Sequence, residues 1–216
     1  MSSFIHVLVG ACLGSHAAWL ADSFRKNCLH WRSRCSYCGQ ELSFADEIPI
    51  ISYLYLHGKC RYCQSGIPAS LFYTEIWGAL SFLPFSFNKK SLAAAIIAFY
   101  FLTLAILDLQ TETIDLRLLV VPTFAAILAC GLNHLLPALV LCLLLAVFAK
   151  CGLLGSGDVY CLAVLGLFWQ QRLPQLLLLA CLFCLASQLL LKSRKAAFVP
   201  YLYLAHLCFS WVYFYA

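Results

Sequence analysis

Charged side chains are scarce in this sequence. Of its 216 residues, 11% are charged and 63% are hydrophobic, and the mean hydropathy is +0.88. A soluble domain carries roughly 25% charged residues, so the composition excludes an ordinary water-soluble enzyme and indicates an integral membrane protein. Long runs rich in Leu and Ala favour helices over a β-barrel, because a helix satisfies its own backbone hydrogen bonds in lipid.

Acidic residues are rarer still, with nine in the whole chain, so each of them carries information.

The first apolar segment, residues 4–20, also lacks the marks of a secretory signal peptide. It has no basic n-region, and no small-x-small cleavage site followed by a soluble domain. We therefore expect this segment to be retained as a membrane helix over residues 4–22.

Seven further apolar runs follow, separated by short polar joints such as residues 192–195. A membrane span needs about 20 apolar residues, and most of the runs approach that length. The sequence thus predicts an all-α, polytopic membrane protein of about eight transmembrane helices. We expect a first helix with a polar loop over residues 1–68, and a multi-helix membrane domain over residues 69–216. The seven runs cover residues 69–86, 91–108, 118–133, 135–151, 158–170, 174–191 and 198–215.

Thirteen cysteines could suggest a disulfide framework, but their distribution argues against one. Cys28 lies in the polar loop without a partner at ligand spacing. Most of the others lie in or beside apolar segments, where cysteine behaves as a small hydrophobe. These are Cys12, Cys130, Cys142, Cys151, Cys161, Cys181, Cys184 and Cys208.

The polar loop holds the remaining four cysteines as two CxxC pairs, Cys35-Ser-Tyr-Cys38 and Cys60-Arg-Tyr-Cys63. Each pair can bind one edge of a metal ion from a tight turn, and this pattern is typical of a tetrahedral zinc site. Four thiolates fill the coordination shell, so the zinc would be structural and would supply folding free energy to the loop. A disulfide alternative requires an oxidising compartment. His30 and His57 flank the cysteines and could serve as ligands, although isolated loop histidines are usually solvated.

Basic residues predict the orientation of the chain. If the loop, residues 23–68, faces the cytoplasm, eleven Lys and Arg residues lie on its side of the membrane and three on the other. The positive-inside rule therefore favours a cytoplasmic loop, where thiols stay reduced and available for a metal. The three basic residues on the opposite side are Lys89, Lys90 and Arg172.

Five acidic residues belong to the first part of the chain. Glu75 lies inside the apolar segment 71–78, where a carboxylate is costly and is usually functional or paired. The alternative for Glu75 is an interfacial anchor beside aromatic residues. Solvated surface positions are expected for the other four, Asp22, Glu41, Asp46 and Glu47.

Asp108 and Asp158 lie at helix ends that the eight-helix topology brings to the same membrane face. Each could be a simple helix-end residue, and the helix dipole favours Asp158 at an N-terminus. The same dipole disfavours Asp108 at a C-terminus, so Asp108 needs another reason to be there. A dyad that shares one proton is such a reason. The ionised carboxylate would take a proton from water that attacks a peptide carbonyl, and the protonated one would donate to the carbonyl oxygen.

Taken together, these motifs resemble those of the type IV prepilin leader peptidases, which are membrane aspartic peptidases with a GxGD sequence. The resemblance covers nearly the whole chain and is most specific in the paired CxxC sequences combined with Gly155-Ser-Gly-Asp158. Further matching segments are Gly14-Ser15, residues 46–54, Gly58-Lys59, Ile67-Pro68, Glu75, residues 108–111 and residues 198–201.

The resemblance implies that Asp108 and Asp158 are catalytic and that the four loop cysteines bind zinc. It implies prepilin or pseudopilin substrates, whose short basic leader is cleaved after glycine on the cytoplasmic side of the bacterial inner membrane. Full-length members also methylate the new N-terminus with S-adenosylmethionine, an activity associated here with Gly58, Lys59 and Glu75. No nucleic-acid partner is expected, and a homo-oligomer is compatible with the sequence.

Three positions depart from the family pattern. The segment 113–116 lacks the family's Pro-Asp, Tyr160 replaces a frequent lysine, and His16 replaces a phenylalanine. Two other functions therefore stay open: a methyltransferase or inactive assembly factor of the same fold, and a zinc-clamped membrane scaffold without catalysis. A presenilin-type protease shares GxGD, but that group does not predict the cysteine loop.

Overall fold

Helices make up the regular secondary structure of the part of the chain that the structure describes, apart from two isolated β-bridges in the polar loop. This confirms the predicted all-α class. The structure is a computed structural model that describes residues 2–26, 33–152, 154–191 and 197–214. Cys28, His30 and the polar joint at 192–195 lie outside the described residues.

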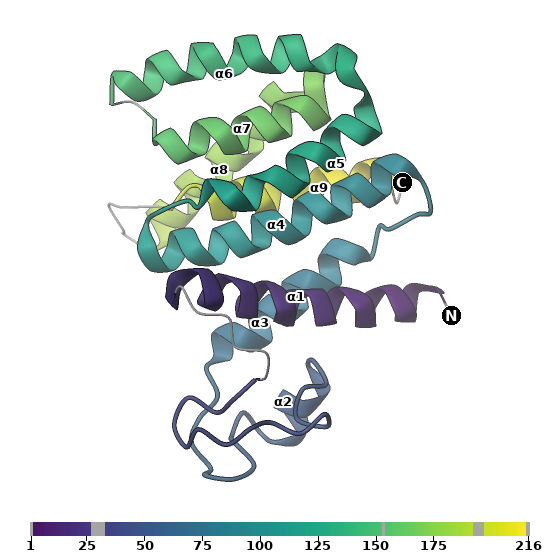
Figure 1. The fold of residues 1–216 in the computed structure, drawn as a ribbon, viewed down its shortest axis with the longest axis vertical. Coiled ribbons are helices and arrows are strands. Elements are labelled where there is room, and N and C mark those ends of the chain that lie inside the picture. The colour runs from purple at the N-terminus through teal and green to yellow at the C-terminus, as the bar shows by residue number, and fades with distance from the viewer. Residues whose placement is uncertain (1, 27–32, 153, 192–196, 215–216) are drawn as a thin grey trace. The chain divides into compact units, whose positions relative to one another are not determined.

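The chain forms two compact units, and unit 1 is Met1–Leu83. Its helices α1 (Ser2–Lys26) and α3 (Ala69–Phe82) pack against each other, and the polar loop between them contains the short helix α2 (Ile51–Tyr55) (Figure 1). The expected functional division between residues 68 and 69 stays a prediction.

Three glycines let the backbones of α1 and α3 touch. A Cβ atom on Gly78 of α3 would lie 2.3 Å from the carbonyl oxygen of Gly10, and one on Gly14 would lie 2.3 Å from that of Thr74. No larger side chain fits at these distances. The Gly10-x-x-x-Gly14 spacing on α1 is the small-residue pattern that allows close helix packing in membranes. Close backbone contact therefore fixes how α1 and α3 cross.

Unit 2, Pro84–Ala216, is a bundle built around α4 (Lys89–Thr111), most of which is buried. In this bundle α4 packs against α5 (Val120–Cys130) and α9 (Val199–Phe214), α7 (Ser156–Trp169) packs against α5 and α6 (Leu135–Lys150), and α8 (Leu173–Leu191) packs against α9 (Figure 1). Short 3-10 turns join some of them, at η1 (Leu116–Leu119), η2 (Leu132–His134) and η3 (Gln170–Arg172).

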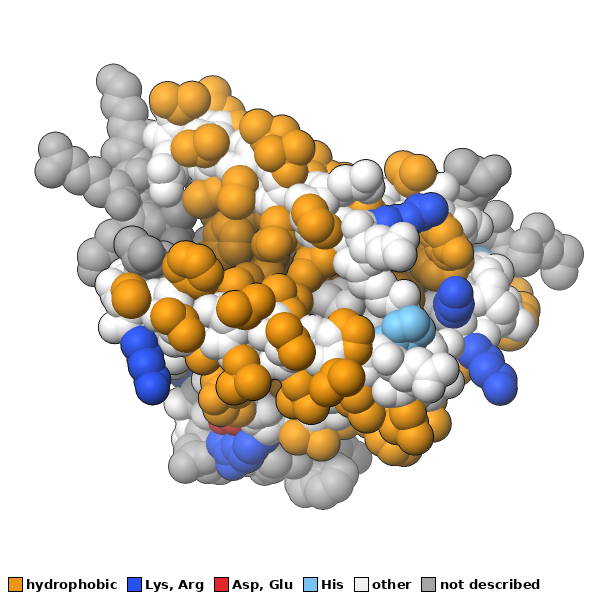
Figure 2. Space-filling view, turned by 90° about the horizontal axis from the view of Figure 1, so that it is seen from above, with side chains coloured by type: hydrophobic (Ala, Val, Ile, Leu, Met, Phe, Trp, Pro, Cys, Tyr) orange, Lys and Arg blue, Asp and Glu red, His pale blue; other side chains and the backbone are white. Residues whose placement is uncertain are grey.

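Four segments of the described residues are long and apolar enough to cross a membrane, and two shorter apolar helices accompany them. The α4 span is 67% buried within the protein, whereas the span that contains α6 is only 6% buried. Figure 2 shows many hydrophobic side chains on the face over α6, with Lys and Arg side chains nearer its edges. Such a face is suited to lipid, which supports the predicted polytopic membrane protein.

A buried polar cluster locks three helices of unit 2 together. His206 of α9 is 0% exposed; its Nδ1 accepts a 2.9 Å hydrogen bond from the Trp169 indole of α7. Its Nε2 lies 3.0 Å from the carbonyl oxygen of Ala94 of α4 and donates to it. The indole N–H fixes the tautomer, because Nδ1 must be the acceptor. All three polar groups are thereby satisfied within the apolar core.

Candidate metal centre and aspartate site

The four loop cysteines form one cluster in unit 1. Their Sγ atoms all lie within 4.8 Å of one another, and those of Cys35 and Cys63 are 3.8 Å apart. In a tetrahedral site with Zn–S bonds of about 2.3 Å, the sulfur atoms are about 3.8 Å apart. The donor set and its spacing therefore fit a metal ion such as zinc. His57 is exposed and does not belong to the cluster.

The first CxxC pair lies in a tight turn closed by backbone hydrogen bonds. The N–H of Cys35 donates to the carbonyl of Gln40 at 3.0 Å, and the N–H of Gly39 donates back to the carbonyl of Cys35 at 2.9 Å. A β-bridge between Arg34 and Glu41 closes the turn, and the two side chains form an ion pair of 2.6 Å. Gly39 has φ of 70°, a conformation that glycine adopts without strain.

The second CxxC pair repeats this arrangement. The N–H of Cys60 donates to the carbonyl of Ser65 at 2.8 Å, the N–H of Gln64 donates to the carbonyl of Cys60 at 3.0 Å, and Lys59 bridges to Gly66. Gln64 has φ of 58° at the position equivalent to the glycine of the first turn. The two turns thus present their sulfur pairs from matching backbone frames.

Hydrogen bonds also prepare the thiols for ligation. The backbone N–H groups of Cys38 and Tyr37 lower the pKa of the Cys35 thiol to about 6. The Ser65 hydroxyl, 3.0 Å from the Cys63 sulfur, lowers the pKa of that thiol, as does the Ser65 backbone. The Gln40 backbone acts to lower the pKa of the Cys38 thiol, but burial and the hydrogen bonds with Cys35 and Cys63 outweigh it and raise this pKa to about 11. Cys35 and Cys63 are therefore the two thiols favoured as thiolates, the form that binds metal.

Asp46 is not the solvated surface residue that the sequence suggested. Its side chain is only 2% exposed and pairs with the Arg61 guanidinium at 2.7 Å, while the Ser43 hydroxyl donates to it at 2.7 Å. Burial acts to raise the pKa of Asp46, but the Ser43 and Arg61 hydrogen bonds outweigh it, and the pKa is lowered. Arg61 lies between Cys60 and Cys63, so the Asp46–Arg61 ion pair attaches the segment around Asp46 to the turn of the second CxxC pair.

Glu75 fastens the polar loop to the helices of unit 1. Its Oε2 accepts a 2.6 Å hydrogen bond from the backbone N–H of Ile50, and the Ser15 hydroxyl of α1 also hydrogen-bonds to it. Ile50, at the start of α2, has φ of 64°, which is unfavourable for a β-branched residue. The expected pairing of Glu75 is therefore with backbone and hydroxyl donors.

Gly58 lies on the other side of α2. It has φ of 68°, and a Cβ there would be 3.0 Å from the ring of Tyr53, which stacks on Phe72 of α3 at 4.8 Å between centroids. Lys59 follows in the bridge of the second metal turn. No hydrogen bond or ion pair joins Gly58 or Lys59 to Glu75 within the described part of the chain. The short helix α2 connects them instead. Glu75 accepts a hydrogen bond from Ile50, which begins α2, and Gly58 follows the end of α2 and lies against the Tyr53 ring.

Asp108 lies near the C-terminal end of α4 and is 8% exposed. Its Oδ2 accepts a buried 3.1 Å hydrogen bond from the backbone N–H of Val199, and the N–H of Phe198 also donates to this carboxyl group. The N-terminus of α9 therefore points at Asp108, and such a terminus favours an anion. These hydrogen bonds offset the unfavourable interaction between the Asp108 carboxylate and the negative C-terminal end of the α4 dipole.

Asp158 lies in the first turn of α7 and follows Gly155 and Gly157, which have different close neighbours. A Cβ on Gly157 would be 2.6 Å from the Ile114 side chain, in the loop that follows α4. A Cβ on Gly155 would be 2.8 Å from the Asp158 carboxylate itself. The GxGD sequence thus lets the start of α7 pack closely against the loop after Asp108.

The structure brings the two aspartates to one end of unit 2, here called the aspartate end. Asp108 interacts electrostatically with Asp158, and both interact with the buried thiol of Cys161. Asp115, in the loop without the family's proline, binds Arg117 at 2.7 Å and accepts the backbone N–H of Arg117 at 3.0 Å. The Arg117 side chain lowers the pKa of Asp115, so this acid stabilises the loop turn.

Sequence reasoning missed three contributors to these sites: Ser65, Ile114 and Val199. Ser65 lies two residues after Cys63, and the equivalent position after the first CxxC pair is Gln40, so the sequence offered no repeated pattern that marks it. The Val199 segment was part of the family resemblance, but no role could be assigned to it. Nothing in the sequence marked Ile114 as the residue that packs against Gly157.

Comparisons with known proteins agree with these motifs. The family model described as the Bacterial Peptidase A24 N-terminal domain matches residues 8–88. A prepilin leader peptidase/N-methyltransferase of Vibrio cholerae is 49% identical over 45 residues, 21% of this chain and 18% of the relative. One of Burkholderia pseudomallei (strain K96243) is 30% identical over 83% of this chain and 69% of the relative.

A relative of the same name from Pectobacterium carotovorum is 28% identical over 85% of this chain and 75% of its own length. No solved structure matches the chain. Across these three relatives, the matched share of the relative's own length runs from 18% to 75%. Because the Burkholderia match reaches well beyond unit 1, similarity extends to the unit that holds the aspartates. The chain belongs to the prepilin leader peptidase/N-methyltransferase family.

Proposed function

We propose that this protein is an aspartic endopeptidase that cleaves the leader of type IV prepilins or pseudopilins. The observation that carries the proposal is the position of Asp108 and Asp158 at the same end of a membrane bundle, where the negative charge of Asp108 acts on the Asp158 carboxyl group. The family membership supports it, because the relatives are named as prepilin leader peptidases. Two close carboxylates share a proton, since both cannot ionise comfortably.

In this mechanism, the ionised carboxylate of the pair removes a proton from a water molecule as that water attacks the scissile carbonyl carbon. The protonated carboxyl group donates a hydrogen bond to the carbonyl oxygen and later a proton to the leaving nitrogen. The backbone N–H groups at the start of α9 hold the Asp108 carboxylate in position. Gly155 and Gly157 let the start of α7 pack closely against the Asp158 carboxylate and the Ile114 side chain, which keeps Asp158 at this end of the bundle.

The proposed substrate fits a site at a membrane surface. Its apolar helix would lie in the bilayer, and its basic leader would stay in the cytoplasm with the scissile bond after glycine at the interface. The proposed orientation in the bacterial inner membrane has the aspartate end and the metal loop facing the cytoplasm. It rests on the eleven-to-three distribution of Lys and Arg.

The test is cleavage of a prepilin by the purified protein in detergent, read by mass spectrometry. Asp108→Asn and Asp158→Asn should each lower the cleavage rate by roughly 10²–10⁴-fold, the usual contribution of acid–base catalysis. Asp115→Asn, at the same end but paired with Arg117, is the matched control and should stay within a few-fold of the parent. Cleavage that persists in both catalytic variants would support the methyltransferase or assembly-factor alternative.

We further propose that unit 1 takes part in N-methylation of the new N-terminus, an activity that the relatives' names include. S-adenosylmethionine would supply the methyl group, and its sulfonium carries a positive charge that suits the Glu75 carboxylate. The supporting observation is that Glu75 and Gly58 both fix α2, next to Lys59 and the metal turn.

Glu75→Gln separates the two activities, because the amide oxygen can still accept the Ile50 N–H while the charge is lost. We expect methylation of the cleaved product to fall at least tenfold while cleavage continues, with Glu47→Gln, an exposed loop carboxylate, as control. Proteolysis of the loop should stay at the parent rate, which shows that the variant is folded. Equal losses of cleavage and methylation would refute a specific role for Glu75.

A further inference from the structure

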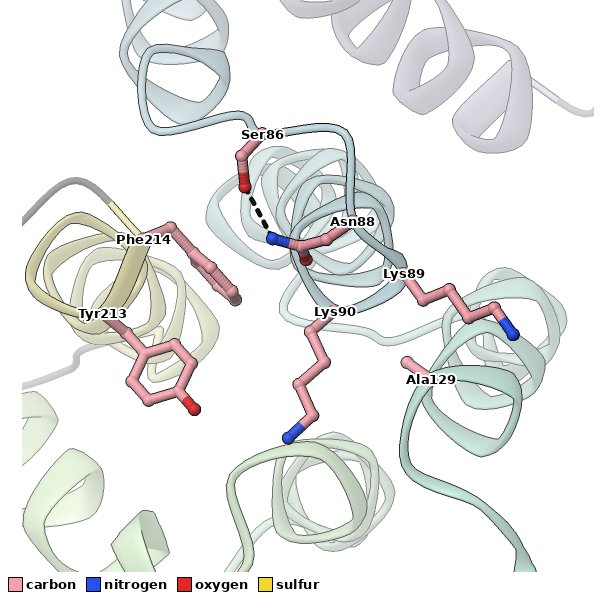
Figure 3. A pocket seen from close by; sticks show the side chains of 7 residues that line it. All are labelled: Ser86, Asn88, Lys89, Lys90, Ala129, Tyr213 and Phe214. Atoms are coloured by element: carbon pink, nitrogen blue, oxygen red, sulfur yellow. Dashed lines mark hydrogen bonds between the residues drawn. The ribbon is translucent and has the colours of Figure 1, made fainter.

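A cavity of about 550 Å³ opens at the end of unit 2 opposite the aspartates. Its lining includes Ser86, Asn88, Lys89, Lys90, Tyr213 and Phe214. Figure 3 shows the side chain of Lys90 extending between Tyr213 and Ala129, while Lys89 extends past Ala129 on the other side. We call this region the lysine end of unit 2.

The lysine end is strongly cationic. Lys89 and Lys90 are exposed, and among the described residues neither forms an ion pair with a carboxylate. The Arg172 guanidinium lies 4.9 Å from the centre of the Tyr213 ring, so a third cation contacts a residue that lines the cavity. The acidic side chains of unit 2 all lie at or beside the aspartate end: Asp108, Glu112, Asp115 and Asp158.

The cavity rim is rigid. Asn88 caps α4 by accepting the N–H of Ser91 at 2.7 Å, and its side-chain amide donates to the Ser86 hydroxyl at 2.7 Å. The N–H of Ser86 donates to the Ser91 hydroxyl at 2.8 Å. Both lysines therefore project from a fixed first helical turn, whose own dipole adds positive potential.

The cavity lies at the depth of lipid headgroups. At about 1.5 Å per residue, the part of α4 between Lys89 and Asp108 is about 28 Å long. This matches a hydrocarbon core of about 30 Å, so the lysine end reaches one headgroup region when the aspartate end reaches the other. Tyr213 is a residue typical of that boundary, because its ring is apolar while its hydroxyl group can reach water.

We propose that the lysine end binds the headgroup of an anionic phospholipid, with Lys90 facing its phosphate and with Lys89 and Arg172 adding to the positive potential around it. Free phosphate offers the same charge, but the position at the bilayer boundary and the aromatic residues of the lining favour a lipid. The site does not depend on the peptidase proposal, because none of its residues belongs to the aspartate site.

The test is a titration of the full chain in zwitterionic detergent with phosphatidylglycerol, with bound lipid counted by native mass spectrometry. One cation near a lipid surface contributes enough for roughly a fivefold change in affinity, so Lys89→Gln with Lys90→Gln should weaken binding about thirtyfold. The matched control combines Lys26→Gln and Lys150→Gln, two lysines outside the cavity, and should bind like the parent. Phosphatidylcholine should bind equally weakly to all three proteins.

Thermal unfolding in the same detergent verifies that the cavity variant is folded. Unchanged phosphatidylglycerol binding in that variant, or an equal loss in the control, would overturn the proposal. A third arm adds inorganic phosphate at millimolar concentration. Displacement of the lipid by phosphate would identify the site as a free-phosphate site, and retention of the lipid supports the proposal.

Discussion

The polar loop of unit 1 is stabilised by one kind of interaction and the helical bundle of unit 2 by another. The loop has few buried apolar residues, and its fold depends on a small number of specific contacts: four sulfur atoms, the Asp46–Arg61 pair and the Glu75–Ile50 hydrogen bond. The bundle has an extended apolar core along α4. Loss of one contact should therefore disable the loop, whereas the bundle should lose stability in small steps.

The largest effect should follow from metal removal. Structural zinc contributes roughly 10–16 kcal/mol in small zinc-folded domains, far more than any contact between loop side chains. We expect Cys35→Ser with Cys60→Ser, or treatment with a strong chelator, to make residues 33–67 cleavable by protease at least a hundredfold faster. Limited proteolysis followed by mass spectrometry locates the cuts.

The bundle serves as the internal control in that experiment. Its thermal unfolding should shift little, and Cys181→Ser, which removes an exposed thiol outside the cluster, should change neither readout. Loop protection that survives in the double variant would mean that side-chain contacts alone suffice, and the contrast between the two regions would fail.

The next largest effect should come from the buried histidine of the bundle. His206→Leu leaves the buried Trp169 indole N–H without an acceptor, at a cost of roughly 1–3 kcal/mol, and removes the additional hydrogen bond to the Ala94 carbonyl. We expect a lower unfolding temperature in detergent with unchanged protease resistance of the loop. His134→Leu, at the half-buried end of η2, is the matched control and should have a much smaller effect. An unaltered unfolding temperature for His206→Leu would remove this cluster from the account of stability.

A smaller effect is expected where unit 1 depends on packing. Gly78→Ala places a methyl group against the backbone of α1, and overpacking of this kind costs roughly 1–3 kcal/mol. Gly66→Ala is the control in the same unit, because no atom lies within 4 Å of the added Cβ. Cysteine crosslinking between α1 and α3 measures the change in packing. Equal crosslinking in both variants would show that the helices separate without cost.

The smallest effect concerns pH. The pKa of Asp46 is lower in the folded loop than in the unfolded chain, so its pairing adds stability above the unfolded value near 4. That contribution is lost as the pH falls through the lower, folded value. Loop proteolysis by an acid-stable protease should therefore rise severalfold below about pH 4 in the parent. Asp46→Asn should be susceptible at every pH and should lose this acid-dependent step.

Much of the bundle could be predicted from sequence, because hydrophobic run length directly encodes membrane helices. The run 135–151 became α6 (Leu135–Lys150), and 174–191 became α8 (Leu173–Leu191). The run 69–86 overshot, since α3 stops at Phe82 and the following residues form the turn before Asn88. Apolar composition continues through that turn, so hydropathy could not locate the end.

The candidate sites, too, could be predicted from the sequence only in part. Cysteine spacing predicted the cluster, because two CxxC turns need only their own backbone geometry to present sulfur pairs. The partners of Asp46 and Asp108 could not be predicted, because Arg61 and Val199 are brought to them by tertiary folding. Local sequence shows that a carboxylate is buried or costly, but not which donor arrives from elsewhere in the chain.

The hydrogen bond from Val199 to Asp108 joins residues 91 positions apart. During synthesis, α4 enters the membrane long before α9 has been made. The Asp108 carboxylate therefore waits for its backbone donors until the last described helix is inserted. The aspartate site is thus incomplete in the nascent chain, and it becomes complete only when α9 has packed into the bundle.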